Sequence, residues 1–147
     1  MKQLDAETVS TSLVEAGWKM RALSGFIERV GPLWTRREPD GWAYGLLAGA
    51  DHTNPAGVVH GGVLTTLADQ ALSSIAWEAV GRRACVTVQL DTHFVAAVRP
   101  GEFVEARGRV VRSTASLVFM QGSLRVADVE VATASAVMKV VTARVDA

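Results

Sequence analysis

The stretch His52-Thr53-Asn54-Pro55-Ala56-Gly57-Val58-Val59-His60-Gly61-Gly62-Val63-Leu64-Thr65-Thr66-Leu67-Ala68-Asp69 decides how this 147-residue sequence is interpreted. A loop rich in Gly, Pro and Asn ends where two glycines open a long helical pattern, which we expect over His60–Val80. The first N–H groups of a helix have no partner within it and lie at its positive end. Glycine also lets another molecule approach that backbone closely. Gly61 and Gly62 are therefore a candidate site for an oxygen that gains negative charge.

Asp69 is the one charged residue of this helical pattern before its last turn. A carboxylate in a mostly apolar helix is costly to bury unless it is hydrogen-bonded or put to use. Thr65, Asp69 and Ser73 recur every four residues and form a polar line on the helix. Gly61 and Asp69 are eight residues apart, roughly 12 Å along a helix, so both cannot reach one reacting carbon.

Pairing of two such helices would remove this difficulty. If two copies pack antiparallel about a two-fold axis near Thr65, Gly61 of one copy approaches Asp69 of the other. The Gly61 N–H and the side-chain amide of Asn54 would then polarise a carbonyl, and Asp69 of the partner would attack it or activate water. The sequence thus predicts a homo-oligomer with composite sites between subunits.

The remaining sequence predicts one helix before this motif and mainly strands on either side of it. We expect an N-terminal helix over Asp5–Leu23, a hairpin from Phe26–Val30 and Trp42–Leu47, and strands over Val86–Val98, Phe103–Arg112, Leu117–Val126 and Val131–Thr142. In Val86–Val98 the alternation places Val86 and Val88 on the core face and Thr87 on the other. One long helix among consecutive antiparallel strands is an α+β layout, and the length suits a single domain over residues 1–147.

The motif and this order of elements resemble the hotdog thioesterases of the phenylacetic-acid-degradation type. The likeness rests on His-x-Asn-x-x-Gly-x-x-His-Gly-Gly, followed by the acid of Leu-Ala-Asp, and extends in element order from about Ser24 to the C-terminus. It implies a hotdog fold, in which a curved antiparallel sheet of about five to six strands wraps a long central helix. It also implies an acyl-CoA substrate that is hydrolysed to a carboxylic acid and free CoA.

The resemblance assigns a role to four residues of the motif. Asn54 and Gly61 would bind the thioester oxygen, Asp69 would be the nucleophile or general base, and His60 would support the helix entrance.

Further site residues are suggested outside the motif. In some relatives a polar residue on the strand after the helix orients water; Thr87 occupies the matching place, and Ser73 is a second candidate. The residues Gly62, Arg82, Arg83 and Arg112 are candidates to contact CoA, although solvated surface is the ordinary role of such arginines.

Other interpretations of the same residues stay open. Asn54 before Pro55 is a common turn residue, the glycine pair could serve close packing, and Asp69 could be a hydrogen-bonded interface carboxylate. His52 and His60 are metal-ligand types, but their spacing matches no familiar zinc pattern, so we expect neither metal nor redox cofactor. A non-catalytic acyl-CoA-binding module and a hotdog enoyl-thioester hydratase or dehydratase are the alternative functions.

Composition argues against several other classes of protein. Fifteen basic residues balance fifteen acidic ones, which leaves no basic surface of the kind that gathers nucleic acid. The apolar runs are far shorter than the roughly 20 residues that cross a bilayer, and the start lacks an apolar signal core. We therefore expect a cytoplasmic homo-oligomer, a dimer of dimers, with Cys85 as a buried small hydrophobe. The sequence does not specify the acyl group.

Overall fold

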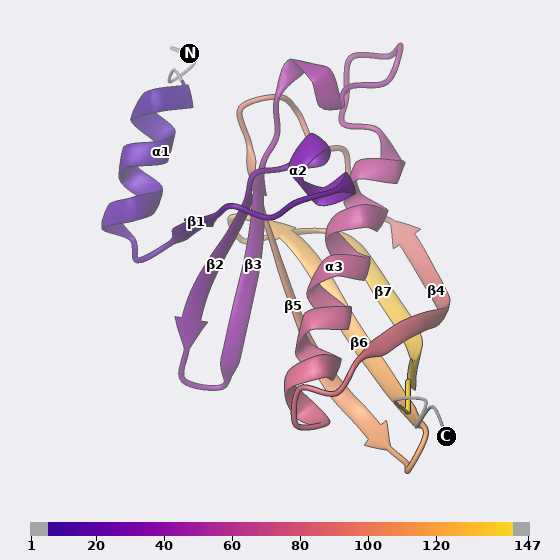
Figure 1. The fold of residues 1–147 in the computed structure, drawn as a ribbon. Coiled ribbons are helices and arrows are strands. Elements are labelled where there is room, and N and C mark those ends of the chain that lie inside the picture. Colours follow the sequence, from indigo (N-terminus) through magenta and orange to yellow (C-terminus); the bar gives the residue numbers. More distant parts are fainter. Residues whose placement is uncertain (1–5, 143–147) are drawn as a thin grey trace.

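A curved antiparallel sheet wraps one long helix, α3, in the computed structural model, which describes residues 6–142 (Figure 1). The helical elements of this part of the chain are α1 (Ala6–Glu15), α2 (Phe26–Val30), the 3-10 turn η1 (Ala50–His52) and α3 (Gly61–Ala79). The strands, in their order across the sheet, are β1 (Lys19–Arg21), β2 (Leu33–Glu38), β3 (Gly41–Leu47), β5 (Phe103–Ser113), β6 (Leu117–Val126), β7 (Val129–Val140) and β4 (Cys85–Phe94). The α+β hotdog layout is confirmed, with seven strands in place of the five to six expected.

The predicted N-terminal helix is shorter than expected. Helix α1 ends at Glu15, and Gly17 follows with a φ of 87°, a conformation that glycine adopts without the strain a side chain would bring. Beyond it, Lys19–Arg21 pairs with β2 as the outermost strand of the sheet. The expectation of a helix as far as Leu23 was therefore wrong, and Asp5, its expected first residue, lies outside the described residues.

The expected opening hairpin has a different first strand. Phe26–Val30 is the short helix α2, because Gly25, with a φ of 81°, turns the chain before it and Gly31 ends it. The strand that pairs with β3 is Leu33–Glu38, immediately after the Gly31-Pro32 step. The hairpin exists, but the sequence prediction began it one segment too early.

Helix α3 buries one apolar face in the main core. The buried residues of this helix are Leu64, Leu67, Ala68, Ala71, Leu72 and Ala76. Gly108 and Gly122 face each other across β5 and β6 beneath Leu72, and a Cβ on either glycine would collide with the Leu72 side chain. The glycine pair therefore lets α3 lie close to the sheet. None of the helices within residues 6–142 is both long and apolar enough to cross a membrane.

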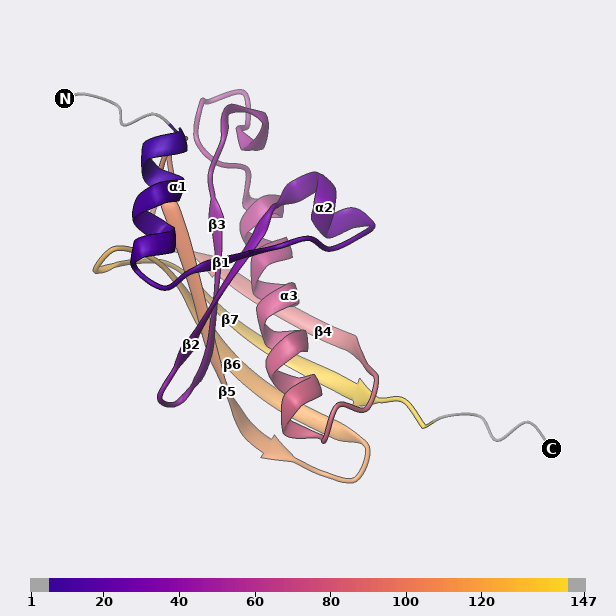
Figure 2. The same cartoon turned by 60° about the vertical axis from the view of Figure 1, so that its left-hand side comes forward.

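Helix α1 belongs to a second, smaller core on the other side of the sheet. Leu13 and Trp18 pack with Trp34 and Ala43, and the Trp18 ring lies edge-on to Phe103 with a centroid distance of 4.9 Å. Figure 2 shows α1 and α3 on opposite sides of β2 and β3. The N-terminal helix is thus remote from the polar line of α3.

Strand β4 departs from the expected alternation. The register of β4 against β7 shifts between Thr87 and Gln89, which is a β-bulge at Val88. Val86 and Val88, expected in the core, are 50% and 60% exposed, whereas Thr87 turns toward α3. The bulge re-aims Thr87 from the outer face, where alternation alone had placed it, to the face that meets the helix.

Candidate active site

Asp69 on α3 and Thr87 on β4 form a short hydrogen bond where the bulge brings the strand to the helix. The Thr87 hydroxyl donates to Asp69 Oδ1 at 2.6 Å. Ser73, one turn further along α3, places its hydroxyl 3.5 Å from Thr87 Oγ1. Because the single Thr87 proton is given to Asp69, Ser73 is the donor in that longer contact. The structure therefore brings together three of the residues singled out from the sequence. The hydroxyl of Ser73 contacts that of Thr87, which donates to Asp69.

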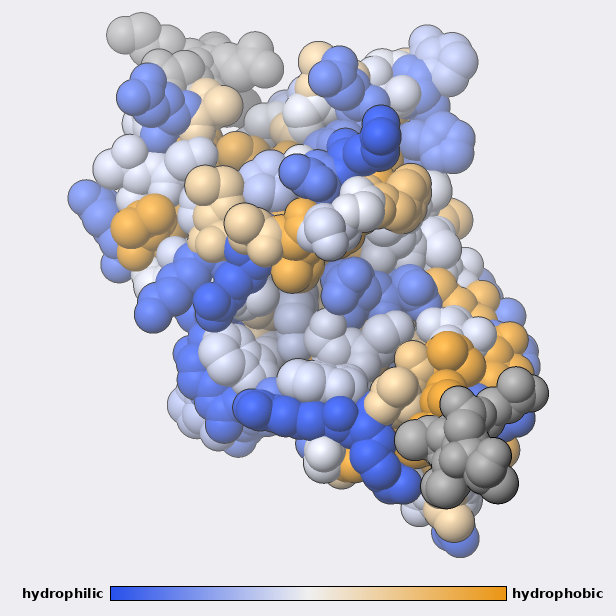
Figure 3. All heavy atoms as spheres, viewed as in Figure 1, coloured by the Kyte–Doolittle hydropathy of each residue, from blue (hydrophilic) through white to orange (hydrophobic). Residues whose placement is uncertain are grey.

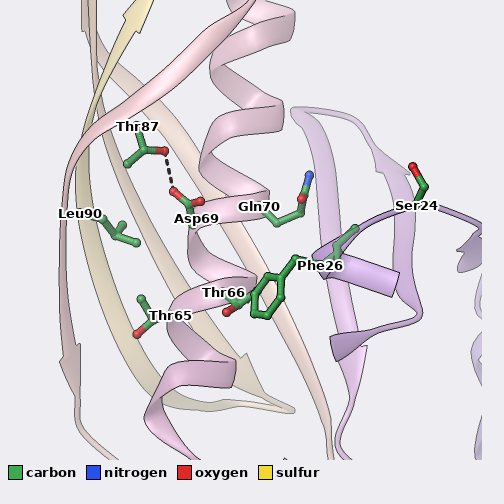
Figure 4. A pocket seen from close by; sticks show the side chains of 9 residues that line it. Ser24, Phe26, Thr65, Thr66, Asp69, Gln70, Thr87 and Leu90 are labelled. Atoms are coloured by element: carbon green, nitrogen blue, oxygen red, sulfur yellow. Dashed lines mark hydrogen bonds between the residues drawn. The ribbon is translucent and has the colours of Figure 1, made fainter. Parts of the chain in front are cut away.

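Asp69 and Thr87 line a cavity of about 550 Å³, which Ser73 does not border. Its lining comes from the segment before α2, from α2 itself, from α3 and from β4: Ser24, Phe26, Ile27, Thr65, Thr66, Asp69, Gln70, Thr87 and Leu90. Figure 4 shows Asp69 and Thr87 facing each other on one side of α3, with Gln70 and Phe26 on the other. Among these described lining residues none is cationic, so Asp69 faces the cavity with a neutral hydroxyl as its partner.

His60 caps the first turn of α3. Its Nδ1 accepts the Gly62 N–H at 2.8 Å, so the cap uses the backbone donor of the second glycine. The Gly61 N–H, in contrast, has no hydrogen-bond partner among the described residues. It is the first N–H of the helix and lies at the positive end of the helix dipole. The backbone group available to an oxyanion is therefore that of Gly61 rather than Gly62.

Asn54 lies in a tight loop directly before this helix. Its Oδ1 accepts the N–H of Ala56 at 2.9 Å, while its own N–H donates to the Val58 carbonyl at 2.8 Å. The loop is closed by a 2.8 Å bond from the His60 N–H to the His52 carbonyl. The turn therefore occupies the oxygen of the Asn54 side chain, while its amide NH2 has no acceptor among the residues that the structure describes. The turn interpretation and the binding interpretation are thus compatible.

The structure places the predicted residues in two groups. Asn54, His60 and Gly61 gather at the start of α3, whereas Asp69, with Thr87, lies two turns further along, roughly 12 Å by the helix rise. A single chain therefore does not bring its own glycine amide to its own carboxylate.

The start of α3 is also closely covered. A Cβ on Gly61 would lie 3.1 Å from the Phe94 ring, a tight contact that glycine avoids where β4 approaches the helix. Phe94 is itself 51% exposed. The Gly61 backbone thus lies beside a ring that faces outward from the chain.

The candidate CoA-binding arginines lie away from the cavity. Arg82 follows the C-terminal end of α3, where it pairs with Glu78 at 3.2 Å. The neighbouring Arg83 donates from Nε to the Val80 carbonyl at 3.0 Å, and Arg112 is exposed near the end of β5. These arginines and Gly62 are not among the residues that line the cavity.

Sequence reasoning missed three polar residues of the cavity wall, Ser24, Thr66 and Gln70. Gln70 follows Asp69 directly, and its Nε2 donates to Ser74 Oγ at 3.1 Å. Ser74 in turn donates from Oγ to the Gln70 carbonyl at 2.8 Å. The amide of Gln70 is therefore oriented from behind, and its four-residue spacing to Ser74 was a signal in the sequence.

The two histidines of the motif act on backbone groups. His52 Nδ1 accepts the Gly49 N–H at 3.0 Å, as His60 Nδ1 accepts that of Gly62. In the described part of the chain no three His, Cys, Asp or Glu side chains gather as a metal site requires. Cys85 is half-buried rather than fully buried.

Comparison with known proteins assigns the family. A family model described as the thioesterase superfamily matches residues 56–133, more than half of the chain. The chain belongs to the thioesterase superfamily. A relative from Pseudomonas aeruginosa, PA0474, whose name places it provisionally among the esterases, is 30% identical over 116 residues, which are 78% of this chain and 87% of that protein.

Solved structures with the fold of this superfamily member include two bacterial proteins. The conserved protein PA5202 from Pseudomonas aeruginosa has 25% identity and a TM-score of 0.75, covering 81% of this chain and 95% of its own. A mutant of the phenylacetic acid degradation protein PaaI from Thermus thermophilus has 24% identity and a TM-score of 0.69, covering 79% and 98%. The recognition of a hotdog protein of this type from its sequence is confirmed.

Proposed function

We propose that this superfamily member hydrolyses an acyl-CoA thioester to a carboxylic acid and free CoA, with Asp69 as the reacting carboxylate. The observation that carries the proposal is the Asp69–Thr87 pair in the wall of the 550 Å³ cavity. A structural carboxylate is normally neutralised by a cation or by several donors. Asp69 instead keeps one hydroxyl partner and faces space in which a substrate fits.

The second half of the site comes, in this proposal, from another copy of the chain. Strand β4 ends the sheet and pairs with β7 along one edge, which leaves its other edge open among the described strands. Strand β4 itself carries exposed apolar residues, among them Val86, Val88 and Phe94. Figure 3 shows apolar side chains gathered over β4. An antiparallel copy on this edge would carry Gly61 and Asn54 of one subunit toward Asp69 of the other.

The reaction then needs three groups. The Gly61 N–H and the Asn54 amide hold the carbonyl oxygen of the thioester as it becomes negative. As a general base, Asp69 takes a proton from water, the hydroxide adds to the carbonyl carbon, and the C–S bond breaks as the proton passes to the leaving thiolate. As a nucleophile, Asp69 would form a mixed anhydride with release of the thiol, and water would then cleave it. Thr87 orients Asp69 in either route.

CoA extends outward from this site in the proposal. Arg82, Arg83 and Arg112 supply positive charges for its phosphates, Arg82 by exchanging its Glu78 partner for phosphate, and Gly62 contributes close backbone packing beside its capped N–H. The assembly is a cytoplasmic dimer of dimers without a metal or redox cofactor.

Release of free thiol from a panel of acyl-CoAs tests the activity. We expect hydrolysis of at least one member by the purified oligomer, and its near-complete loss in Asp69→Asn. A folded oligomer that binds acyl-CoA without turnover would instead be a binding module. Loss of an enoyl thioester by addition of water, without release of thiol, would indicate a hydratase.

A further inference from the structure

A second cavity shares the α2 residue Ile27 with the Asp69 cavity. Its volume is about 340 Å³, and it is lined by Met20, Arg21, Ala22, Leu23, Ile27, Glu28, Pro32 and Leu33. We call it the Leu23 cavity. Ile27 lines both cavities, and Leu23 precedes Ser24, which lines the first. The two spaces are therefore neighbours that share the side chain of Ile27.

Polarity falls along the line from Asp69 to the Leu23 cavity. Around Asp69 the wall is made of hydroxyl and amide side chains such as Thr66 and Gln70. At the α2 end it becomes apolar through Phe26 and Ile27 (Figure 4). Six of the eight residues that line the Leu23 cavity are apolar, among them the buried Leu33, and its two charged residues, Arg21 and Glu28, are exposed.

Helix α2 is suited to divide the two spaces. It has no fully buried residue, and Phe26 is 67% exposed. Ile27 is its partly buried contact with the main core, together with Val30. Ile27 is thus the residue of α2 that borders both cavities, and the volume of its side chain bears on both.

We propose that the Leu23 cavity receives the distal hydrocarbon of an acyl chain whose carbonyl lies at Asp69, and that Ile27 sets the chain length that passes. This inference rests on the proposed function, because it takes the thioester to lie beside Asp69. Acyl-CoA is polar at the thioester and apolar at the far end of the chain, which matches the order of side chains along the two cavities. Ile27 is then a specificity-determining residue.

Two opposite substitutions test the inference. Ile27→Ala opens the wall, and we expect the ratio of kcat/KM for a dodecanoyl thioester to that for a butanoyl thioester to rise about tenfold. Ala22→Trp fills the Leu23 cavity from an exposed position without touching the core, and the same ratio should fall about tenfold. Val111→Ala, on the outer face of the sheet and outside both cavities, is the matched control and should keep the wild-type ratio.

Binding of free dodecanoate and butanoate, measured by calorimetry on the same proteins, separates the two proposals. If the wild type hydrolyses no acyl-CoA, the proposed function fails, while tighter dodecanoate binding in Ile27→Ala and weaker binding in Ala22→Trp would still support the channel. If the folded variants keep the wild-type preference between the two lengths, in turnover or in binding, Ile27 does not divide an acyl channel.

Discussion

Two carboxylates of this protein, Glu38 on β2 and Asp69 on α3, are held in opposite ways. Glu38 accepts bonds from Arg107 at 2.7 and 2.9 Å and from Arg36 at 2.7 Å. Arg107, assisted by Arg36, lowers the pKa of Glu38 to about 2, against the partial burial that raises it. Asp69 has one hydrogen bond to residues 6–142, from the neutral hydroxyl of Thr87, and borders a cavity.

The difference separates a carboxylate that stabilises the fold from one that is free to react. Guanidinium groups donate to both carboxylate oxygens of Glu38 and balance its charge. Glu38 is therefore a poor base or nucleophile toward any further group. Within the described part of the chain, the second carboxylate oxygen of Asp69 has no hydrogen-bond partner, and the side chain borders the 550 Å³ cavity. A neutral donor orients such a carboxylate without neutralising it, which suits a base or a nucleophile.

The largest effect is expected from removing the charge of each carboxylate in turn. Asp69→Asn keeps the shape of the side chain but removes its basic oxygen, so hydrolysis should fall about 10³-fold. Glu38→Gln is the matched control and should leave kcat/KM within about twofold of wild type, because it is remote from the cavity. The rate of thiol release by the purified oligomers of both variants is the measurement. Equal losses of activity in Asp69→Asn and Glu38→Gln would show that the two carboxylates do not differ in role.

Giving Asp69 a cation would make it resemble Glu38. Because Thr87 is exposed, the longer side chain of Thr87→Lys can be accommodated, and its ammonium group can lie beside Asp69. We expect a loss of about 10²-fold in kcat, because an ion-paired carboxylate is a weaker base and nucleophile. Activity at the wild-type level in a folded Thr87→Lys oligomer would show that the neutral environment of Asp69 is unimportant.

Removal of the single donor should have a smaller effect. Thr87→Val keeps the volume of the side chain but loses the 2.6 Å bond, and we expect kcat to fall about tenfold. Thr87→Ser retains the hydroxyl and should stay near wild type. A steady-state comparison of the two variants tests the orienting role, which an equal loss in both would contradict.

The smallest effect concerns stability. At pH 7, Glu38→Gln should lower the free energy of unfolding by about 1–2 kcal/mol, since ion pairs that are partly exposed are screened by solvent. The pKa of Glu38 is lower in the folded chain than its ordinary value of 4.5, so its contribution is complete above pH 4.5. It is lost as pH falls from 4.5 toward 2. Denaturant melts of wild type and variant should converge over that range.

Much of the fold was predictable because it depends on local pattern. The glycine pair and the helical spacing placed the long helix at His60–Val80, and the structure has it at Gly61–Ala79. The strand Leu117–Val126 was predicted with its observed bounds. Gly31-Pro32 marked a boundary correctly, but the five residues before it fold as a helix because they pack on the core through Ile27.

The site was predictable in its residue types and less so in its geometry. The spacing of Asn54, Gly61 and Asp69 identified both groups, because each belongs to one local segment. The inward turn of Thr87 was not predictable from alternation, since it follows from a shift in pairing with β7, about fifty residues away in sequence. The cavity wall at α2 likewise depends on tertiary packing.

Mixing two inactive variants tests the central claim, that Asp69 acts on a carbonyl held by the other subunit, most directly. Asn54→Asp should inactivate the oxygen-binding half while keeping the turn through its side-chain oxygen, and Asp69→Asn should inactivate the other half. After subunit exchange, each mixed dimer has one intact composite site, so activity should return to about a quarter of the wild-type value. If the mixture stays as inactive as its parents although mixed dimers have formed, the two halves belong to one chain and the account is wrong.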